Sequence, residues 1–294
     1  MSNLYDSITE KIIQLIEESR TLPWQKPWNI AFPSNAVTGR RYRGINALIL
    51  SAANFADQRW LTFRQAQELG GHVRKGEKAT QITLWKFNDE KADDEKQKRI
   101  APLVRAYSVF NVEQCEGLGL APIDVKEISP EPLAAADDLL ARYVSAPRVV
   151  HGADNACYIP ARDRVEMPSA QTFVSGESYF GTFAHELIHS TGSADRLARK
   201  GVTEPIYFGS ENYAHEELVA EIGSAFVCAE FGIDNTIESN AAYVDNWLDA
   251  LKRDRSLIIR AAGQAQKASD WILGTGTVSF LKQSHDLSQG PDMS

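Results

Sequence analysis

The feature that most constrains this chain is His185-Glu186-Leu187-Ile188-His189, in which two histidines stand four residues apart with a glutamate beside the first. On a helix, residues at this spacing share one face, so both imidazoles can reach a single ion. A glutamate in this position is typical of zinc peptidases, where it acts as the general base toward the attacking water. The motif therefore predicts a helix-borne metal site with His185 and His189 as ligands and Glu186 as the catalytic residue.

A third ligand is expected from the helix predicted over residues 213–231, which carries Glu217 and Glu221 one turn apart. Two carboxylates on one face suggest that one binds the ion and the other holds a ligand imidazole in place. The spacing is similar to the Glu-x-x-x-Asp arrangement of many Glu-type zincins, in which the first acid is the ligand. We therefore expect Glu217 to bind the metal and Glu221 to support a histidine, with the reverse as the alternative. The other interpretation of this segment is that Glu216 and Glu217 only form a solvated helix face.

Three protein ligands leave one coordination position open, which is the form of a catalytic rather than a structural site. Two histidines and one glutamate favour Zn²⁺, although Mn²⁺ or another divalent ion fits the same set.

The segment from Arg20 to Lys86 is strongly basic, with eleven basic and three acidic residues in a chain whose formal net charge is −8. Aromatic residues are interleaved with these cations. Single-stranded nucleic acid binds to such mixtures, because cations follow the phosphates and ring faces stack on unpaired bases. No helix-turn-helix, zinc-finger or basic-helix pattern favours duplex DNA, and a protein-binding face is the alternative. The candidate nucleic-acid-binding residues are Trp24, Lys26, Trp28, Arg40, Arg41, Tyr42, Arg43, Arg74, Lys75 and Lys78.

The hydrophobic pattern predicts an α+β protein with two domains, residues 1–125 and 126–294, separated near the Ser-Pro-Glu-Pro stretch at 129–132. The run 88–99 is charged and has no apolar period, so we expect an exposed hairpin tip there. The strand at 164–167 is expected at a sheet edge, where an extended peptide could add to it. Helices are expected at 1–20, 47–56, 63–69, 133–144, 178–190, 213–231 and 240–262, and strands at 81–87, 103–111, 149–150, 157–159 and 164–167.

The cellular setting is suggested by what the sequence lacks. It has three scattered cysteines without a paired spacing, which argues against a disulfide framework. No stretch approaches the roughly 20 apolar residues that span a bilayer, and residues 1–20 lack the segments of a signal peptide. We expect a cytoplasmic protein with no membrane partner.

Two ordered sets of motifs resemble the family of ArdC-type antirestriction proteins. The segments 22–28, 33–35, 38–39, 42–46, 60–63 and 71–77 are similar to that family's N-terminal single-stranded-DNA-binding domain. His185 to His189, together with Glu217 to Glu221, is similar to its C-terminal zincin-like metallopeptidase domain. The resemblance implies a plasmid-borne protein that protects DNA entering by conjugation from the recipient's restriction enzymes.

The partners implied are single-stranded DNA and a restriction endonuclease or another DNA-bound protein as substrate. The alternative is a non-enzymatic protein that coats single-stranded DNA or occludes the nuclease, with a metal that only stabilises the fold.

Overall fold

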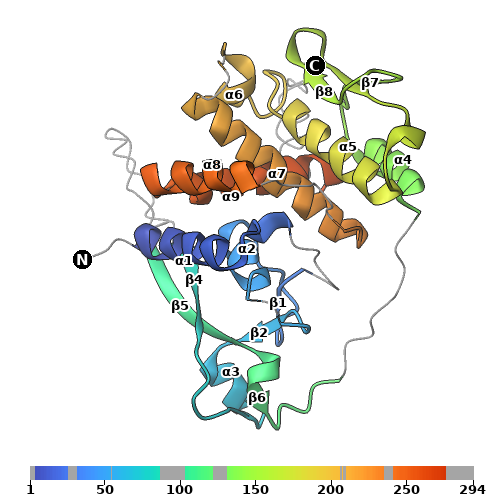
Figure 1. Cartoon of the computed structure of the whole chain (residues 1–294). Coiled ribbons are helices and arrows are strands. Elements are labelled where there is room, and N and C mark those ends of the chain that lie inside the picture. The colour runs from blue at the N-terminus through green and yellow to red at the C-terminus, as the bar shows by residue number, and fades with distance from the viewer. Residues whose placement is uncertain are drawn as a thin grey trace, which may run out of the picture.

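The structure, a computed structural model, describes residues 4–25, 32–53, 55–86, 103–121, 131–205, 207, 210–234 and 241–275. It combines helices and strands in two parts, as predicted. A four-stranded sheet, a two-stranded sheet and helices form the N-terminal part, and a helical assembly with a three-stranded sheet forms the C-terminal part (Figure 1). The predicted hairpin tip and the predicted domain boundary fall at 87–102 and 122–130, outside the described residues.

The N-terminal sheet has four strands in the order β1-β2-β5-β4. Its long members β4 and β5 pair antiparallel, which confirms the predicted hairpin. Helix α2 covers the β4 edge, because the Asn46 side chain accepts from the backbone N–H of Thr83 at 2.8 Å and donates to its carbonyl at 2.7 Å. The unpaired backbone groups of an edge strand can pair with another chain. The Asn46 amide occupies those of Thr83 and so blocks part of this edge. The elements are β1 (Ser34–Asn35), α2 (Ile45–Ser51), β2 (Arg59–Leu61), α3 (Phe63–Glu68), β3 (His72–Val73), β4 (Thr80–Lys86), β5 (Leu103–Asn111) and β6 (Cys115–Glu116).

The C-terminal sheet has three strands in the order β7-β9-β8, namely Arg148–His151, Arg164–Met167 and Cys157–Ile159. Strand β9 pairs with β7 in parallel and with β8 antiparallel. The expectation that residues 164–167 form an edge strand is therefore wrong, because β7 and β8 occupy both of its sides. Among the described residues, β8 is an edge strand.

The C-terminal helices are α4 (Pro132–Arg142), α5 (Gly176–Ser190), α6 (Lys200–Thr203), α7 (Glu211–Phe231), α8 (Ala241–Arg253) and α9 (Leu257–Leu273). The single helix predicted over 240–262 is wrong, since the chain breaks between α8 and α9. The Asp254 side chain causes this break by accepting from the backbone N–H and the hydroxyl of Ser256, at 2.9 and 2.7 Å. Such local bonds compete with helix continuation.

One hydrophobic core joins the two halves of the sequence. Helix α1 (Leu4–Ser19) buries Ile8, Ile12 and Ile16 in the same cluster that contains Phe226 of α7 and Ile258 of α9. In Figure 1, α1 and α2 accordingly lie against α8 and α9. Since these helices share one core, a fragment ending at residue 125 would expose apolar surface that the whole chain covers. None of the helices in the described residues has the length and apolar character needed to cross a membrane.

Candidate metal centre

Helix α5 carries the histidine motif and presents it on the face opposite its buried side. The helix begins at Gly176, two residues earlier than expected, because Ser175 and Ser178 form a reciprocal cap before it. Its apolar side, including Phe180, Leu187 and Ile188, has no exposed surface.

Helix α7 approaches α5 very closely, and Gly223 makes this possible. A Cβ atom at position 223 would lie 2.8 to 3.0 Å from three side-chain carbons of Ile188. Such contacts are far shorter than van der Waals distance, so a larger residue would push the two helices apart. The glycine therefore helps to bring the glutamates of α7 to the histidines of α5.

The three predicted ligands converge. The Nε2 atoms of His185 and His189 are 3.1 Å apart, and carboxylate oxygens of Glu217 lie 3.6 and 3.7 Å from them. Metal–nitrogen and metal–oxygen bonds of about 2.0–2.2 Å place neighbouring ligand atoms at roughly these separations. Among the described residues, this is also the one group of three His, Cys, Asp or Glu side chains with donor atoms close enough for a shared ion. The residues present therefore fit a divalent metal.

The charges in the site are strongly coupled. Burial lowers the pKa of His185, but its hydrogen bond to Glu217 and the nearby carboxylates outweigh burial and raise that pKa to about 8. Burial raises the pKa of Glu217, and its interactions with His185 and His189 reverse the shift and lower it. Glu217 is thus held as a carboxylate beside the two imidazoles, which is the form that binds a metal.

The support for His189 comes from Glu216, which the sequence suggested only as part of a solvated face. Glu216 is 3% exposed, and its Oε1 lies 3.1 Å from Nδ1 of His189. Arg199 donates to both of its oxygens, at 2.9 and 2.7 Å. Burial raises the pKa of Glu216, but the hydrogen bonds from Arg199 and His189 dominate and lower it to about 2. Since the other nitrogen of His189 faces the ligand cluster, this chain fixes the ring and its tautomer.

Glu221, the residue expected to hold an imidazole, makes its hydrogen bond elsewhere. It is 1% exposed, and its Oε2 accepts from the indole N–H of Trp24 at 2.7 Å. Glu221 makes no hydrogen bond to a ligand histidine in the structure, and the carboxylate that holds an imidazole there is Glu216, on His189. Burial raises the pKa of Glu221 to about 7, against the opposing effects of Trp24 and His185.

A cavity of about 460 Å³ opens over the ligands. His185, His189 and Glu217 line it together with Glu186, which is 8% exposed. Cys157 and Tyr158 of the edge strand β8 also line this cavity, a role that sequence reasoning missed. A molecule in this cavity can therefore meet the ligand cluster, the candidate base and a free strand edge at once.

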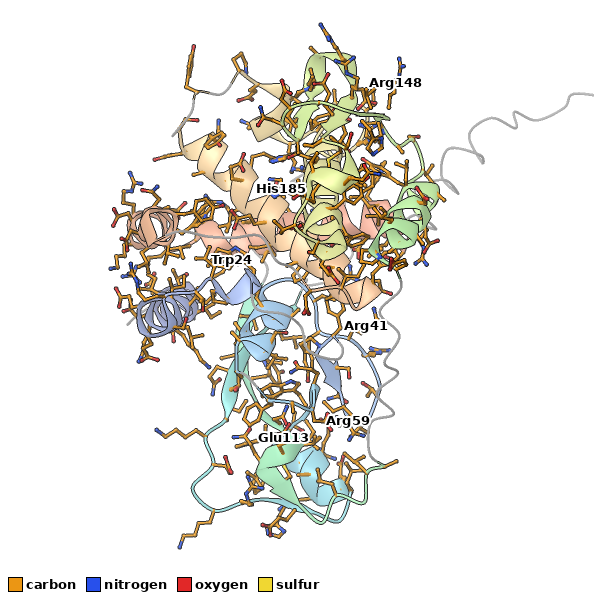
Figure 2. All side chains as sticks on the ribbon, turned by 45° about the vertical axis from the view of Figure 1, so that its right-hand side comes forward. Trp24, Arg41, Arg59, Glu113, Arg148 and His185 are labelled. Atoms are coloured by element: carbon orange, nitrogen blue, oxygen red, sulfur yellow. The ribbon has the colours of Figure 1, made fainter. Side chains whose placement is uncertain are left out.

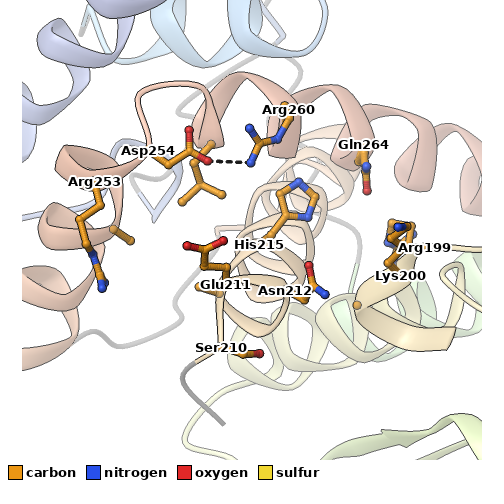
Figure 3. Close-up of a pocket in the computed structure, with 14 residues that line it drawn as sticks. Arg199, Lys200, Ser210, Glu211, Asn212, His215, Arg253, Asp254, Arg260 and Gln264 are labelled. Atoms are coloured by element: carbon orange, nitrogen blue, oxygen red, sulfur yellow. Dashed lines mark hydrogen bonds and ion pairs between the residues drawn. The ribbon is translucent and has the colours of Figure 1, made fainter. Parts of the chain in front are cut away.

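A second cavity, of about 300 Å³, lies at the start of α7 near the turn between α8 and α9 (Figure 3). It shares the wall residue Gly201 with the first cavity, and the ion pair between Asp254 and Arg260 borders it. His215 points into this second space and does not line the cavity over the ligands. His215 is therefore close to the predicted ligands in the sequence but does not line the cavity over them.

Trp24 does not lie on a surface that DNA can reach. Its ring has no exposed area and packs edge-on against Trp247, with the ring centroids 6.4 Å apart. The prediction that it stacks on DNA is therefore wrong. Lys26 and Trp28 lie outside the described residues.

The remaining candidate residues for nucleic-acid binding lie in two regions of the structure, and the first region is the junction with the C-terminal helices. Arg41 and Arg43 form ion pairs with Glu230 of α7 and Asp270 of α9, so they bridge to the C-terminal helices. Figure 2 shows Trp24 and Arg41 at this junction, away from Arg59 and Glu113 in the outer N-terminal part.

The other candidates lie in the N-terminal part. Tyr42 packs partly buried against the small core around Trp60. Arg74 pairs with Glu77 at 2.7 Å. The side chains of Arg40, Lys75 and Lys78 are exposed and form no ion pair with the described residues.

Comparison with known proteins agrees with this architecture. Residues 2–110 match the family model for the N-terminal domain of anti-restriction factor ArdC, and residues 134–264 match the model for a zincin-like metallopeptidase. The Mn(II)-bound crystal structure of the antirestriction protein ArdC from plasmid R388 superimposes with a TM-score of 0.75 and 35% identity, covering 95% of this chain and all of that one. Its metal-free crystal structure gives a TM-score of 0.72 and 36% identity, covering 92% of this chain and 97% of that one.

Relatives found by sequence similarity extend the comparison. Two DNA primases TraC of Escherichia coli are each 39% identical over 92% of this chain, which spans only 27% and 20% of their lengths. An uncharacterised protein of Sinorhizobium fredii, y4eC, is 32% identical over 92% of both chains. With both domain models matched in order, and with ArdC and y4eC aligned over 92% or more of their length, the chain belongs to the ArdC antirestriction family and combines an ArdC N-terminal domain with a zincin-like metallopeptidase domain.

Proposed function

We propose that this protein binds one divalent ion through His185, His189 and Glu217 and hydrolyses peptide bonds in proteins associated with DNA. The observation that carries the proposal is the convergence of the three ligand atoms in a cavity that Glu186 also lines. Zn²⁺ is the ion that this ligand set favours, and the Mn(II)-bound structure of the related ArdC supports a divalent ion of either kind.

The roles of the residues follow from their positions. A bound divalent ion would act as a Lewis acid toward the scissile carbonyl and the attacking water. Glu186 takes the proton from that water and delivers it to the leaving amine. Glu216 keeps His189 in the tautomer that offers Nε2 to the cavity, and the Arg199 guanidinium keeps Glu216 ionised.

The edge of β8 offers a place for the substrate backbone. Cys157 and Tyr158 line the cavity over the ligands, and β8 pairs with β9 on one side only among the described strands. An extended peptide added to this edge would run past the ligand cluster and be held mainly by backbone hydrogen bonds. This replaces the role that the sequence suggested for residues 164–167.

We further propose that the N-terminal part binds single-stranded DNA and that the protein serves in antirestriction during plasmid transfer. The matched ArdC N-terminal domain supports a DNA-related role. Lys75 and Lys78 supply exposed cations next to the β4–β5 hairpin, where Tyr107 is 39% exposed. Phosphates following the cations and a base stacked on the ring would bind without a strong sequence preference.

The test of catalysis is the full-length Glu186→Gln variant, with Glu177→Gln in the first turn of the same helix as its control. Glu186→Gln should keep one bound Zn²⁺ per chain and lose cleavage of fluorescein-labelled casein in the presence of oligo(dT), whereas Glu177→Gln should behave as wild type. Cleavage that survives in Glu186→Gln at the wild-type rate would exclude Glu186 as the base.

The antirestriction role is tested by plasmid transfer into a restricting recipient. The peptidase proposal predicts that Glu186→Gln loses protection. Full protection by this variant would instead support the alternative, in which the protein coats DNA or blocks the nuclease and the metal serves the fold.

A further inference from the structure

A residue far from the metal motif in the sequence reaches the edge of the metal centre. Trp24 lies in a short 3₁₀ turn, Pro23–Gln25, separated from the end of α1 by three residues, and its indole N–H donates to Oε2 of Glu221, 197 positions away. Both side chains are buried, with exposed fractions of 0% and 1%. The hydrogen bond therefore crosses from the N-terminal part of the chain to the helix that carries the third ligand.

The other oxygen of Glu221 is buried and has no hydrogen-bond partner in the structure. Nδ1 of His185 is in the same situation. The negative charge of Glu221 acts on the imidazole of His185. The indole of Trp247, whose nitrogen also has no hydrogen-bond partner in the structure, is a second neighbour that lowers the pKa of Glu221. Buried polar atoms without partners cost free energy, so a buried acceptor and a buried ring nitrogen that are both left without a partner indicate a contact that forms when His185 binds a metal through Nε2.

We propose that Trp24 is a positioning residue of the metal centre, holding Glu221 by one oxygen so that the other faces Nδ1 of His185. A carboxylate without a hydrogen bond at either oxygen could rotate about its own axis. The hydrogen bond from the indole to one oxygen prevents this rotation and fixes the direction of the second oxygen. His189 is held by the chain Arg199–Glu216, and Trp24–Glu221 is the matching chain for His185. The inference rests on the proposed metal site.

The consequence is that the metallopeptidase domain does not contain its whole metal centre. The residue that orients one ligand comes from before residue 26, within the segment matched by the ArdC N-terminal model. Events that move the turn at Pro23–Gln25 would therefore change metal binding, without any contact between the N-terminal sheet and the ion.

The test is a titration of the full-length protein with Mn²⁺, followed by the electron paramagnetic resonance signal of the free ion. Trp24→Phe keeps an aromatic ring and removes the N–H donor. Trp60→Phe is the matched control, because Trp60 is equally buried and its indole nitrogen has no hydrogen-bond partner in the structure. Trp24→Phe should weaken Mn²⁺ binding about tenfold, the lower end of what supporting contacts to metal ligands contribute, while Trp60→Phe should leave it unchanged.

A double-mutant cycle with Glu221→Gln separates positioning from packing. If Trp24 acts through Glu221, then Trp24→Phe adds no further loss in the Glu221→Gln background. An equal loss in both backgrounds, or a Trp24→Phe variant that binds Mn²⁺ as wild type does, would overturn the inference. Failure of the wild type itself to bind Mn²⁺ would overturn the metal centre and the inference with it.

A measurement on the wild type covers the case in which Trp24→Phe does not fold. In ¹H–¹⁵N spectra with assigned indole resonances, addition of diamagnetic Zn²⁺ should shift the Trp24 indole N–H and leave that of Trp60 in place. A stationary Trp24 signal at full Zn²⁺ occupancy would contradict the proposal.

Discussion

The ion pair between Glu216 and Arg199 should be one of the most costly contacts to break in this protein. The side chains are 3% and 4% exposed, so water screens the pair very little. Replacing Glu216 by Gln leaves the guanidinium buried without its counter-charge, which typically costs about 3–5 kcal/mol. The pKa of Glu216 gives a similar magnitude, since a fall from 4.5 to about 2 corresponds to roughly 3 kcal/mol at about 1.4 kcal/mol for each pH unit.

The assay is urea unfolding of the full chain in a chelating buffer, so that metal binding does not contribute. Glu216→Gln should lower the free energy of unfolding by about 3 kcal/mol. Glu211→Gln, an exposed position at the start of the same helix, should lower it by less than about 0.5 kcal/mol. A loss below about 1 kcal/mol for Glu216→Gln would refute the reasoning, because that is the range of a surface ion pair.

The contribution of Glu216 to the free energy of unfolding should also change with pH in a definite direction. The folded-state pKa of Glu216 lies below its ordinary value, so its contribution is fully present above about pH 4.5 and is lost as the pH falls toward 2. The difference in stability between wild type and Glu216→Gln should therefore shrink on going from pH 5 to pH 3. A difference that widens over this interval would mean that Glu216 is not held ionised by Arg199.

The remaining predictions concern the helix contact, the third ligand and the DNA surface. Gly223→Ala should reduce the free energy of unfolding by about 1–3 kcal/mol, as overpacking does, and weaken metal binding; unchanged values would show that the two helices have room to move apart. Glu217→Ala should lose Zn²⁺ more completely than Glu221→Ala in a chelator competition, and the opposite order would make Glu221 the ligand. Lys75→Ala with Lys78→Ala should weaken oligo(dT) binding and reduce the slope of log affinity against log salt by about 1.4, at about 0.7 per phosphate contact; an unchanged slope would place the DNA elsewhere.

Local pattern was sufficient to predict which three side chains converge. His185 and His189 stand one turn apart on α5, where helical spacing alone puts them on one face, and Glu217 comes from the next long helix, which the sequence also predicts. The structure brings their donor atoms together as expected.

The supporting residues could not be predicted in the same way, because their partners are distant in the sequence. Arg199 comes from the start of a four-residue helix and Trp24 from a three-residue turn, and neither segment has a periodic pattern. The sequence offers Glu216 only as part of a solvated helix face, because a glutamate is rarely buried without a partner and Arg199 is distant in the sequence.

The aromatic and basic segment shows the same limit for surfaces. Composition indicates that cations and rings are present, but it does not separate a ring in the core from a ring in solvent. Trp24, a candidate for stacking on DNA, is fully buried, whereas Phe63, which is not among the candidates, is 51% exposed. Arg41 and Arg43 are bound to acids of the C-terminal helices, a contact that depends on how the two parts pack.

The central claim is that one divalent ion is held by two histidines of α5 and one glutamate of α7. Anomalous diffraction at the Mn absorption edge, from crystals of the full chain grown with Mn²⁺, tests it most directly. The account predicts one strong peak within bonding distance of Nε2 of His185, Nε2 of His189 and the Glu217 carboxylate, with Glu216 and Glu221 outside that distance. A peak bonded to Glu221 or Glu216, or no peak at the histidines, would contradict it.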